Sequence, residues 1–390
     1  MNLNKITIKK TLAVFLLIMA MISALAAPAS ADGYQVSGGT ATFNKYLIVD
    51  ENANVPNVTF SYQIAPGTAI SATTSTVEVL PGVSGATVGT AAFSANDTKL
   101  TEKAAGDTVT LDSGENYVKK TVTLDFTACS FDEPGIYRYI LTEQETGGAM
   151  GITYDTQKGD GATAKQRTVD VYVTDNGGTL TVSGYIIHEN TAAPAAGADN
   201  GSAGVRLADK SDGFVNEYET HDLTISKTVT GNQGSKDKYF KFTVKIEGAV
   251  AGTKYTVSLD NAEAASGSTS ATKSENRGQT NVTELVVKND GTVEADFYLK
   301  HGQSIVIYGL AKGTGYTVTE EAEDYTSSNS SGYTGTIAGE DVTAAFTNTR
   351  DGQVPTGVML SILPGAVLIA LGGGAWLLIA AGKRKKNGEA

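Results

Sequence analysis

Six polar side chains occupy positions where the sequence pattern expects apolar ones. Each lies in a segment that alternates apolar and polar residues, and side chains two residues apart in such a segment share one face. All six share their face with residues such as Phe, Leu, Val or Tyr, so they should point into a core. They are Lys45, Glu143 and Asn216 in the first half of the chain, and Lys227, Glu320 and Asn348 in the second half.

A lysine, a glutamate and an asparagine that are buried together can react. Burial lowers the pKa of a lysine and raises the pKa of a glutamate, so the pair can become neutral. A neutral amine is a nucleophile, and a protonated glutamic acid can polarise a carboxamide and shuttle protons. Held in contact, the lysine and asparagine can form an isopeptide bond and release ammonia. The alternative is a structural Lys–Glu ion pair with a hydrogen-bonded asparagine, and the pattern leaves both open.

The two sets of three occur in the same order, which indicates a duplicated unit. Early in each half is a strand with one internal lysine, in ATFNKYLIV and DLTISKTV. Later comes a tyrosine-containing strand that ends in Thr-Glu, in IYRYILTE and GYTVTE. Each half then closes on Phe-x-Asn, at residues 214–216 and 346–348. We expect the boundary between the halves near Glu217–His221.

The elements that position these residues are predicted to be β-strands. The turn signals Asp175–Gly178 and Asn289–Gly291 lie between strand-like runs and predict hairpins. No sustained helical period appears outside the two ends of the chain. We therefore predict an all-β fold of two tandem immunoglobulin-like β-sandwich domains, residues 32–218 and 219–350. Alternating segments rich in Val, Thr and Tyr include 117–126, 167–174, 179–188, 238–246, 282–288 and 292–299.

The two ends carry export and anchoring signals. A basic start, an apolar stretch and Ala29-Ser30-Ala31 predict a cleavable signal peptide over residues 1–31, with cleavage after Ala26 as the alternative. Residues 351–357 are a linker that ends in Pro-Thr-Gly. The apolar segment 358–382 is long enough to span a bilayer, and the basic tail 383–390 should stay in the cytoplasm. The body is therefore expected to be exported and transiently tethered to the membrane.

The composition excludes several classes of partner. The whole chain has a net charge of −12, from 30 basic and 42 acidic residues. The signal peptide and the segment after Thr356 hold seven of the basic residues and one acidic residue, so the exported body keeps 23 against 41, a net charge of −18. Nucleic acid and anionic lipid both require a basic patch, so neither is expected as a partner.

Other kinds of site find little support in the sequence. Cys129 is the single cysteine, which excludes an intramolecular disulfide, and we expect it to pack as a small apolar residue. His188, His221 and His301 lie on separate segments without ligand-like spacing, so we expect no metal and no cofactor. No hydrolase signature or phosphate-binding loop is present, which argues against an anchored enzyme.

The sequence resembles the backbone (major) pilins of Gram-positive sortase-assembled pili, especially the streptococcal T-antigen type with its pilin isopeptide-linkage domain. The likeness spans nearly the whole mature chain. It implies two intramolecular bonds, Lys45 to Asn216 promoted by Glu143, and Lys227 to Asn348 promoted by Glu320, each tying the first strand of a domain to its last. The strings that carry it are EPGIYRYILTE (133–143), LTISKTVTG (223–231), GYTVTEE (315–321), AFTN (345–348) and QVPTG (353–357).

The resemblance also implies how the subunits are joined. A membrane sortase would cut between Thr356 and Gly357 and hold Thr356 as a thioester, which a lysine of the next subunit attacks. Lys210, shortly before the closing strand of the first domain, is the expected acceptor, with Lys165 and Lys158 as rivals. The Tyr-Pro-Lys-Asn motif of other backbone pilins is absent.

The sorting motif departs from the common Leu-Pro-x-Thr-Gly, which indicates a dedicated pilin sortase. The expected partners are that sortase, other copies of the chain, minor pilins and peptidoglycan, and the expected location is a pilus on the cell wall. The alternative is a minor pilin or wall-anchored adhesin that uses the same domains and sorting signal. On either hypothesis the chain is not an enzyme beyond its own cross-linking.

Overall fold

The computed structural model describes residues 39–74, 76–145, 151–155, 165–189, 210–259 and 282–353. The expected signal peptide, the sortase motif at Thr356 and Gly357, the membrane segment, the basic tail and Lys158 lie outside the described residues. Within these ranges there is no helix with the length and hydropathy of a membrane span.

The first eleven strands build two sheets that face each other. One sheet has the order β4-β6-β1-β11-β8, and the other has the order β10-β9-β7-β2-β5 with β3 beside β7. We call this pair of sheets the first domain. Its strands are β1 (Thr40–Asp50), β2 (Val58–Pro66), β3 (Leu80–Pro81), β4 (Thr87–Val88), β5 (Ala91–Phe93), β6 (Glu115–Asp125), β7 (Gly135–Gln144), β8 (Ile152–Thr153), β9 (Gln166–Asp175), β10 (Leu180–His188) and β11 (Gly213–Tyr218).

The remaining strands build a second pair of sheets. A six-stranded sheet has the order β15-β14-β17-β12-β21-β19, and a four-stranded sheet has the order β16-β13-β18-β20. We call this pair the second domain. Its strands are β12 (Thr220–Thr230), β13 (Phe240–Glu247), β14 (Lys254–Leu259), β15 (Glu284–Val286), β16 (Val293–Leu299), β17 (Ser304–Ala311), β18 (Gly315–Glu321), β19 (Thr326–Ser327), β20 (Tyr333–Thr336) and β21 (Val342–Thr349).

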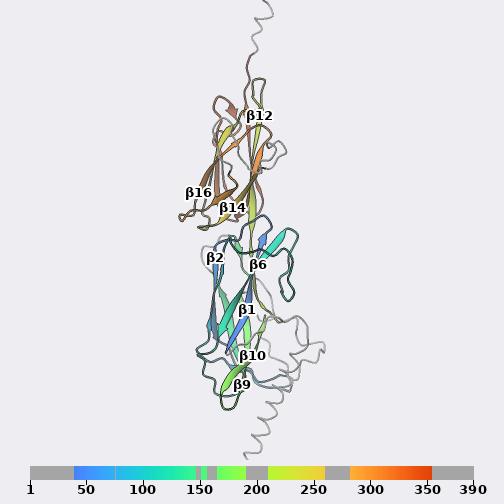
Figure 1. Ribbon diagram of the computed structural model, residues 1–390, viewed down its shortest axis with the longest axis vertical. Helices are drawn as coiled ribbons and strands as arrows, with labels where there is room; N and C mark the ends of the chain where they lie inside the picture. The colour runs from blue at the N-terminus through green and yellow to red at the C-terminus, as the bar shows by residue number, and fades with distance from the viewer. Residues whose placement is uncertain are drawn as a thin grey trace, which may run out of the picture.

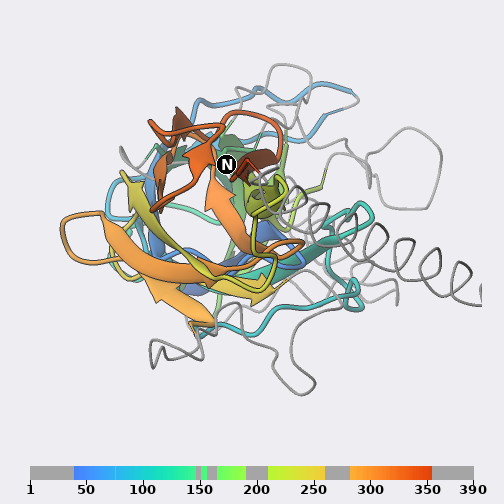
Figure 2. The same cartoon turned by 90° about the horizontal axis from the view of Figure 1, so that it is seen from above.

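Each domain buries one apolar core between its two sheets, and the predicted all-β sandwich architecture is confirmed. Strand alternation explains the cores, because every second side chain of a strand faces the opposite sheet. In β9, for example, Val169, Val171 and Val173 all point inward and are fully buried. The view along the long axis shows the two sheets of the second domain packed face to face (Figure 2).

The first and last strands of each domain lie side by side and run parallel. In the first domain β1 pairs with β11, and in the second β12 pairs with β21. The sheets that hold these pairs are therefore mixed, with parallel as well as antiparallel neighbours. At the start of β11 the backbone of Gly213 has a φ of 154°, and a Cβ there would lie 1.7 Å from the carbonyl oxygen of Asn44, so glycine allows the close approach of the two strands.

The two predicted hairpins have different outcomes. Residues 175–178 connect β9 to β10, which pair antiparallel, and Asn176 donates its backbone N–H to the Thr179 carbonyl at 2.8 Å. Residues 289–291 also form a turn, but the hairpin prediction is wrong there. The flanking strands β15 and β16 pair with β14 and β13, in different sheets, because the chain crosses the sandwich at this turn.

The two domains lie end to end in an elongated molecule (Figure 1). Glu219 is the single residue between β11 and β12, and its carbonyl accepts the backbone N–H of Lys312 at 3.0 Å. The side chain of Asn54 in the first domain donates to the Lys254 carbonyl of the second at 3.1 Å. A one-residue connection with contacts on both sides holds the domains in line.

Candidate functional site

Lys45, Glu143 and Asn216 meet in the core of the first domain. The lysine comes from β1, the asparagine from the adjacent β11, and the glutamate from β7 of the facing sheet. Lys45 Nζ lies 2.7 Å from Glu143 Oε1, and Asn216 Nδ2 donates to the same oxygen at 3.2 Å. None of the three residues is more than 2% exposed. One carboxylate oxygen therefore bridges the amine and the carboxamide.

Lys227, Glu320 and Asn348 form the same arrangement in the second domain. Lys227 Nζ lies 2.5 Å from Glu320 Oε1, and Asn348 Nδ2 donates to that oxygen at 2.9 Å. Lysine and asparagine again come from neighbouring first and last strands, and the glutamate comes from β18 of the facing sheet. The Glu320 side chain is 1% exposed. The repeated order of lysine, glutamate and asparagine in the sequence thus corresponds to two clusters with the same arrangement of amine, carboxylate and carboxamide.

Strand register fixes the lysine and the asparagine at matching places. In the first domain Asn216 lies opposite Leu47, two residues after Lys45 and on the same face. In the second domain Asn348 lies opposite Val229, again two residues after the lysine. Because the register is the same, each lysine and its asparagine occupy diagonal positions on one face of a strand pair.

A phenyl ring packs against each amine, and neither lysine side chain is exposed to solvent. Lys45 Nζ lies 4.6 Å from the ring centre of Phe60, and Lys227 Nζ lies 4.4 Å from that of Phe240. The residue opposite the glutamate differs between the domains: Tyr62 pairs with Glu143, whereas Phe242 pairs with Glu320. In the second domain Ser327 instead donates its hydroxyl to Glu320 Oε2 at 3.2 Å.

Burial shifts the lysines and Glu143 toward neutrality. Desolvation lowers the pKa of Lys45 to about 8, although the charge and hydrogen bond of Glu143 oppose the shift. Desolvation also lowers the pKa of Lys227, against the opposing effect of Glu320. For Glu143 desolvation raises the pKa despite its contacts with Lys45 and Asn216. Both shifts favour transfer of a proton from Lys45 to Glu143, which leaves a nucleophilic amine and a carboxylic acid.

Two further charged residues adjoin the first cluster and were missed in the sequence. Asp155 donates its backbone N–H to Asn216 Oδ1 at 2.9 Å, and its Oδ2 lies 2.6 Å from Arg167 Nη2. Arg167 shares the inward face of Val169 on β9, so strand alternation could have found it. Asp155 lies beyond a two-residue strand with no period, so no local signal marks it.

The expected acceptor, Lys210, lies on the first domain but away from the cluster. It forms an isolated antiparallel bridge with His188, at the end of the edge strand β10. Three residues later β11 begins and carries Asn216 into the core. The rival Lys165 has a positive φ of 68° and forms an ion pair with Glu145.

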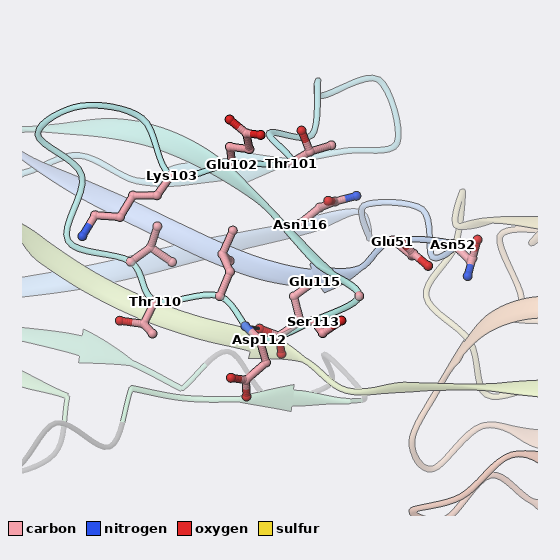
Figure 3. A pocket seen from close by; sticks show the side chains of 13 residues that line it. Glu51, Asn52, Thr101, Glu102, Lys103, Thr110, Asp112, Ser113, Glu115 and Asn116 are labelled. Atoms are coloured by element: carbon pink, nitrogen blue, oxygen red, sulfur yellow. Dashed lines mark hydrogen bonds between the residues drawn. The ribbon is translucent and has the colours of Figure 1, made fainter.

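The remaining candidates do not form a second site. The thiol of Cys129 is partly buried and accepts the Tyr139 hydroxyl at 3.6 Å, and burial raises its pKa. Within the described ranges, His, Cys, Asp and Glu residues form no group of three or more that could hold a metal ion. An open polar hollow with a volume of about 890 Å³ lies beside β1 and β6, and none of the six cluster residues lines it. Figure 3 shows the side chains that line it.

Two family models match consecutive parts of the chain. Residues 43–219 match the model of the Spy0128-like isopeptide containing domain, and residues 221–350 match a domain of unknown function. The first match begins two residues before Lys45 and ends three residues after Asn216.

A pilin of Streptococcus pyogenes serotype M1 is 28% identical over 377 residues, which cover 90% of this chain and 92% of that pilin. The chain is thus similar to this streptococcal pilin along nearly its whole length. The pilus tip adhesin Cpa of the same species is 37% identical over 150 residues, only 36% of this chain and 18% of the adhesin. The solved major pilin protein T3.2 of S. pyogenes has the same fold, with a TM-score of 0.53 at 22% identity over 82% of this chain and all of that one.

We predict a characteristic pH dependence when the first cluster cannot react. Asn216→Ala leaves Lys45 and Glu143 buried without the carboxamide. Unfolded Lys45 keeps its proton up to its usual pKa of 10.5, whereas the folded residue loses it near pH 8. Between these values the unfolded state binds more protons, so the free energy of unfolding should rise with pH, by up to about 1.4 kcal/mol per pH unit.

Chemical denaturation of the first domain between pH 8 and 9.5 measures this slope. The double variant Lys45→Met/Asn216→Ala is the matched control and should lack the rise. Equal slopes in the two proteins would contradict the assignment of a lowered pKa to Lys45.

Proposed function

We propose that this chain is the shaft subunit of a covalent surface pilus and that each domain closes itself with a Lys–Asn isopeptide bond. The observation that carries the proposal is the pair of buried Lys–Glu–Asn clusters. In both, at the same strand register, one glutamate oxygen contacts the amine and the carboxamide. A buried Lys–Glu ion pair does not require a carboxamide on the same glutamate oxygen, yet both domains have one there. We also propose that the domain limits lie at residues 218 and 219, since Glu219 alone separates β11 from β12.

The bonds would stabilise the domains as disulfides do in other exported proteins, by reducing the conformational entropy of the unfolded chain. They would close loops of about 172 and 122 residues, each worth on the order of 5 kcal/mol by the chain-entropy estimate. Unlike a disulfide, an isopeptide bond is not opened by reductants. By suppressing local opening it would also protect the chain from proteases.

We predict that the mature chain, residues 32–356, is lighter than its sequence mass by two ammonia molecules. Glu143→Ala should restore the mass of one, because the first cluster then lacks its proton shuttle. Glu320→Ala should restore the other, and the double variant should have the full sequence mass. Intact-mass spectrometry measures all four proteins.

Peptide mapping assigns each loss, since a bond joins the peptide with Lys45 to the one with Asn216, or Lys227 to Asn348. Glu145→Ala, which changes a carboxylate outside the core, is the control and should keep both bonds. A wild-type chain of unmodified mass would refute the cross-linking proposal.

We propose that the subunits join head to tail through Thr356 and Lys210. β12 starts at the junction between the domains, and the parallel β21 ends at Thr349, seven residues before Thr356. β11 runs toward the junction, so Lys210, which precedes it, lies on the other side. The two linking residues are then separated along the molecule, as an extended polymer requires. The sortase, minor pilins and peptidoglycan are the partners this assembly implies, and its location is the cell-surface pilus.

Lys210→Arg should abolish the high-mass ladder of covalent polymer when the chain is expressed with its sortase. Arginine keeps the charge but is not acylated, so folding and the mass deficit should be unchanged. Lys165→Arg is the matched control and should leave the ladder intact. If Lys165→Arg abolishes the ladder and Lys210→Arg does not, the assignment of Lys210 as acceptor is wrong. If the wild-type chain gives no ladder, the minor-subunit alternative is favoured.

With these links, tension would pass unequally through the two domains. It would enter at Lys210, follow β11 directly into β12, cross from Lys227 to Asn348, and leave through Thr356. The second bond therefore lies in the load path, whereas the first lies beside it and anchors β11 to β1.

We predict that Glu320→Ala polymers extend under force and that Glu143→Ala polymers do not. Without the second bond, about 120 residues between Lys227 and Asn348 can be pulled out, roughly 400 Å per subunit at full extension. Single-molecule force spectroscopy on polymers measures the step length. Steps of equal size in both variants would contradict this load path.

A further inference from the structure

The carboxamide oxygen of Asn216 has a donor that its counterpart lacks. The backbone N–H of Asp155 points at Asn216 Oδ1 with an N···O distance of 2.9 Å, and Asp155 is only 4% exposed. In the second domain Asn348 Oδ1 is buried and accepts no hydrogen bond from any described residue. The two clusters therefore differ at the atom on which negative charge develops during amide exchange.

We propose that the backbone N–H of Asp155 is the oxyanion donor for the first isopeptide bond, and that Arg167 is the residue that positions it. This inference rests on the proposed function, because it concerns the same reaction. A fixed N–H that already contacts the carbonyl oxygen stabilises the charge on that oxygen without reorganisation.

The reaction step balances with the groups present. Lys45 Nζ first passes one proton to Glu143. The neutral amine then attacks Asn216 Cγ, and the carbonyl π electrons move to Oδ1. The hydrogen bond from the Asp155 N–H stabilises the negative charge on Oδ1. The oxyanion collapses, the Cγ–Nδ2 bond breaks, and Nδ2 leaves as ammonia. Glu143, 3.2 Å from Nδ2, gives the leaving nitrogen a proton and takes one from Nζ. One N–C bond forms, one breaks, and the remaining proton stays on Glu143 or leaves with ammonia.

The position of the donor is fixed by a buried clamp. Asp155 Oδ2 accepts the backbone N–H of Val215 at 2.8 Å and lies 2.6 Å from Arg167 Nη2. Arg167 Nε in turn donates to Ser211 Oγ at 3.1 Å and to the Gly213 carbonyl at 3.0 Å. Val215 and Gly213 belong to the strand that carries Asn216. The clamp therefore holds the donor and its acceptor in one rigid unit.

An amide-to-ester replacement at Asp155 tests the donor directly. The α-hydroxy analogue of aspartate, introduced at this position during cell-free synthesis of the mature chain, keeps the side chain and removes the N–H. The first bond should form roughly a hundredfold more slowly, as for loss of one oxyanion donor, while the second forms at its usual rate in the same molecule. The slowing should be the same at every pH, because an N–H does not titrate.

The time course of the two cross-linked peptides, measured by mass spectrometry, gives both rates. The same ester at Asp290, in an exposed turn of the second domain, is the control and should change neither rate. An unchanged first rate in the Asp155 ester overturns the proposal. If the unsubstituted chain forms no first bond at all, the proposed function itself has failed, which is a separate outcome.

Side-chain variants keep the test decisive if the ester protein does not fold. Asp155→Asn retains the N–H and an oxygen for Val215, and should form the first bond at close to the usual rate. Asp155→Ala releases the clamp and should slow it, as should Arg167→Met, with Arg167→Lys intermediate. Normal formation of the second bond shows that the second domain has folded, and resistance of the first domain to limited proteolysis shows the same for the domain that carries the variant. A wild-type first rate in both Asp155→Ala and Arg167→Met overturns the proposal.

Discussion

The structure depends on the removal of two lysine amines from water. A buried, isolated ammonium is strongly disfavoured, and even a buried ion pair recovers its desolvation cost only with good geometry. Lys45 and Lys227 each face a phenyl ring and one carboxylate oxygen, with no solvent access. Proton transfer within the pair relieves the cost and makes the amine reactive. An amide bond to the neighbouring asparagine would remove the charge permanently. Desolvation of the amine is therefore the cause both of the free-energy cost of burial and of the amine's reactivity.

The sandwich architecture makes this chemistry conditional on correct folding. The lysine and the asparagine lie on adjacent strands of one sheet, but the glutamate comes from the other sheet. The three groups meet only when the sheets have packed and water has left the space between them. In an open or misregistered chain the amine stays hydrated and protonated near neutral pH, and no reaction is expected. A cross-link of this kind would therefore record the native register of the first and last strands.

The two domains repeat one plan with different local solutions. Tyr62 lies opposite Glu143, whereas Phe242 lies opposite Glu320. Ser327 donates a hydrogen bond to Glu320. The first domain adds the Asp155–Arg167 clamp on its closing strand. In the head-to-tail fibre proposed above, the two domains would have different tasks. The first would present the acceptor region beside β11, whereas the second would carry the load between its first and last strands.

The sequence alone determined the all-β fold class, the repeated order of lysine, glutamate and asparagine, and the inward faces of Lys45 and Lys227, because alternation is a local property of the backbone. It also contained a readable signal for Arg167, on the same face as three buried valines. It did not determine that residues 289–291 join strands of different sheets, that the first and last strands run parallel, or that the N–H of Asp155 meets Asn216. Those features depend on strand pairing and loop placement between residues far apart in the chain. Only the tertiary structure decides them, because the free energy that selects one pairing over another comes from packing both sheets together.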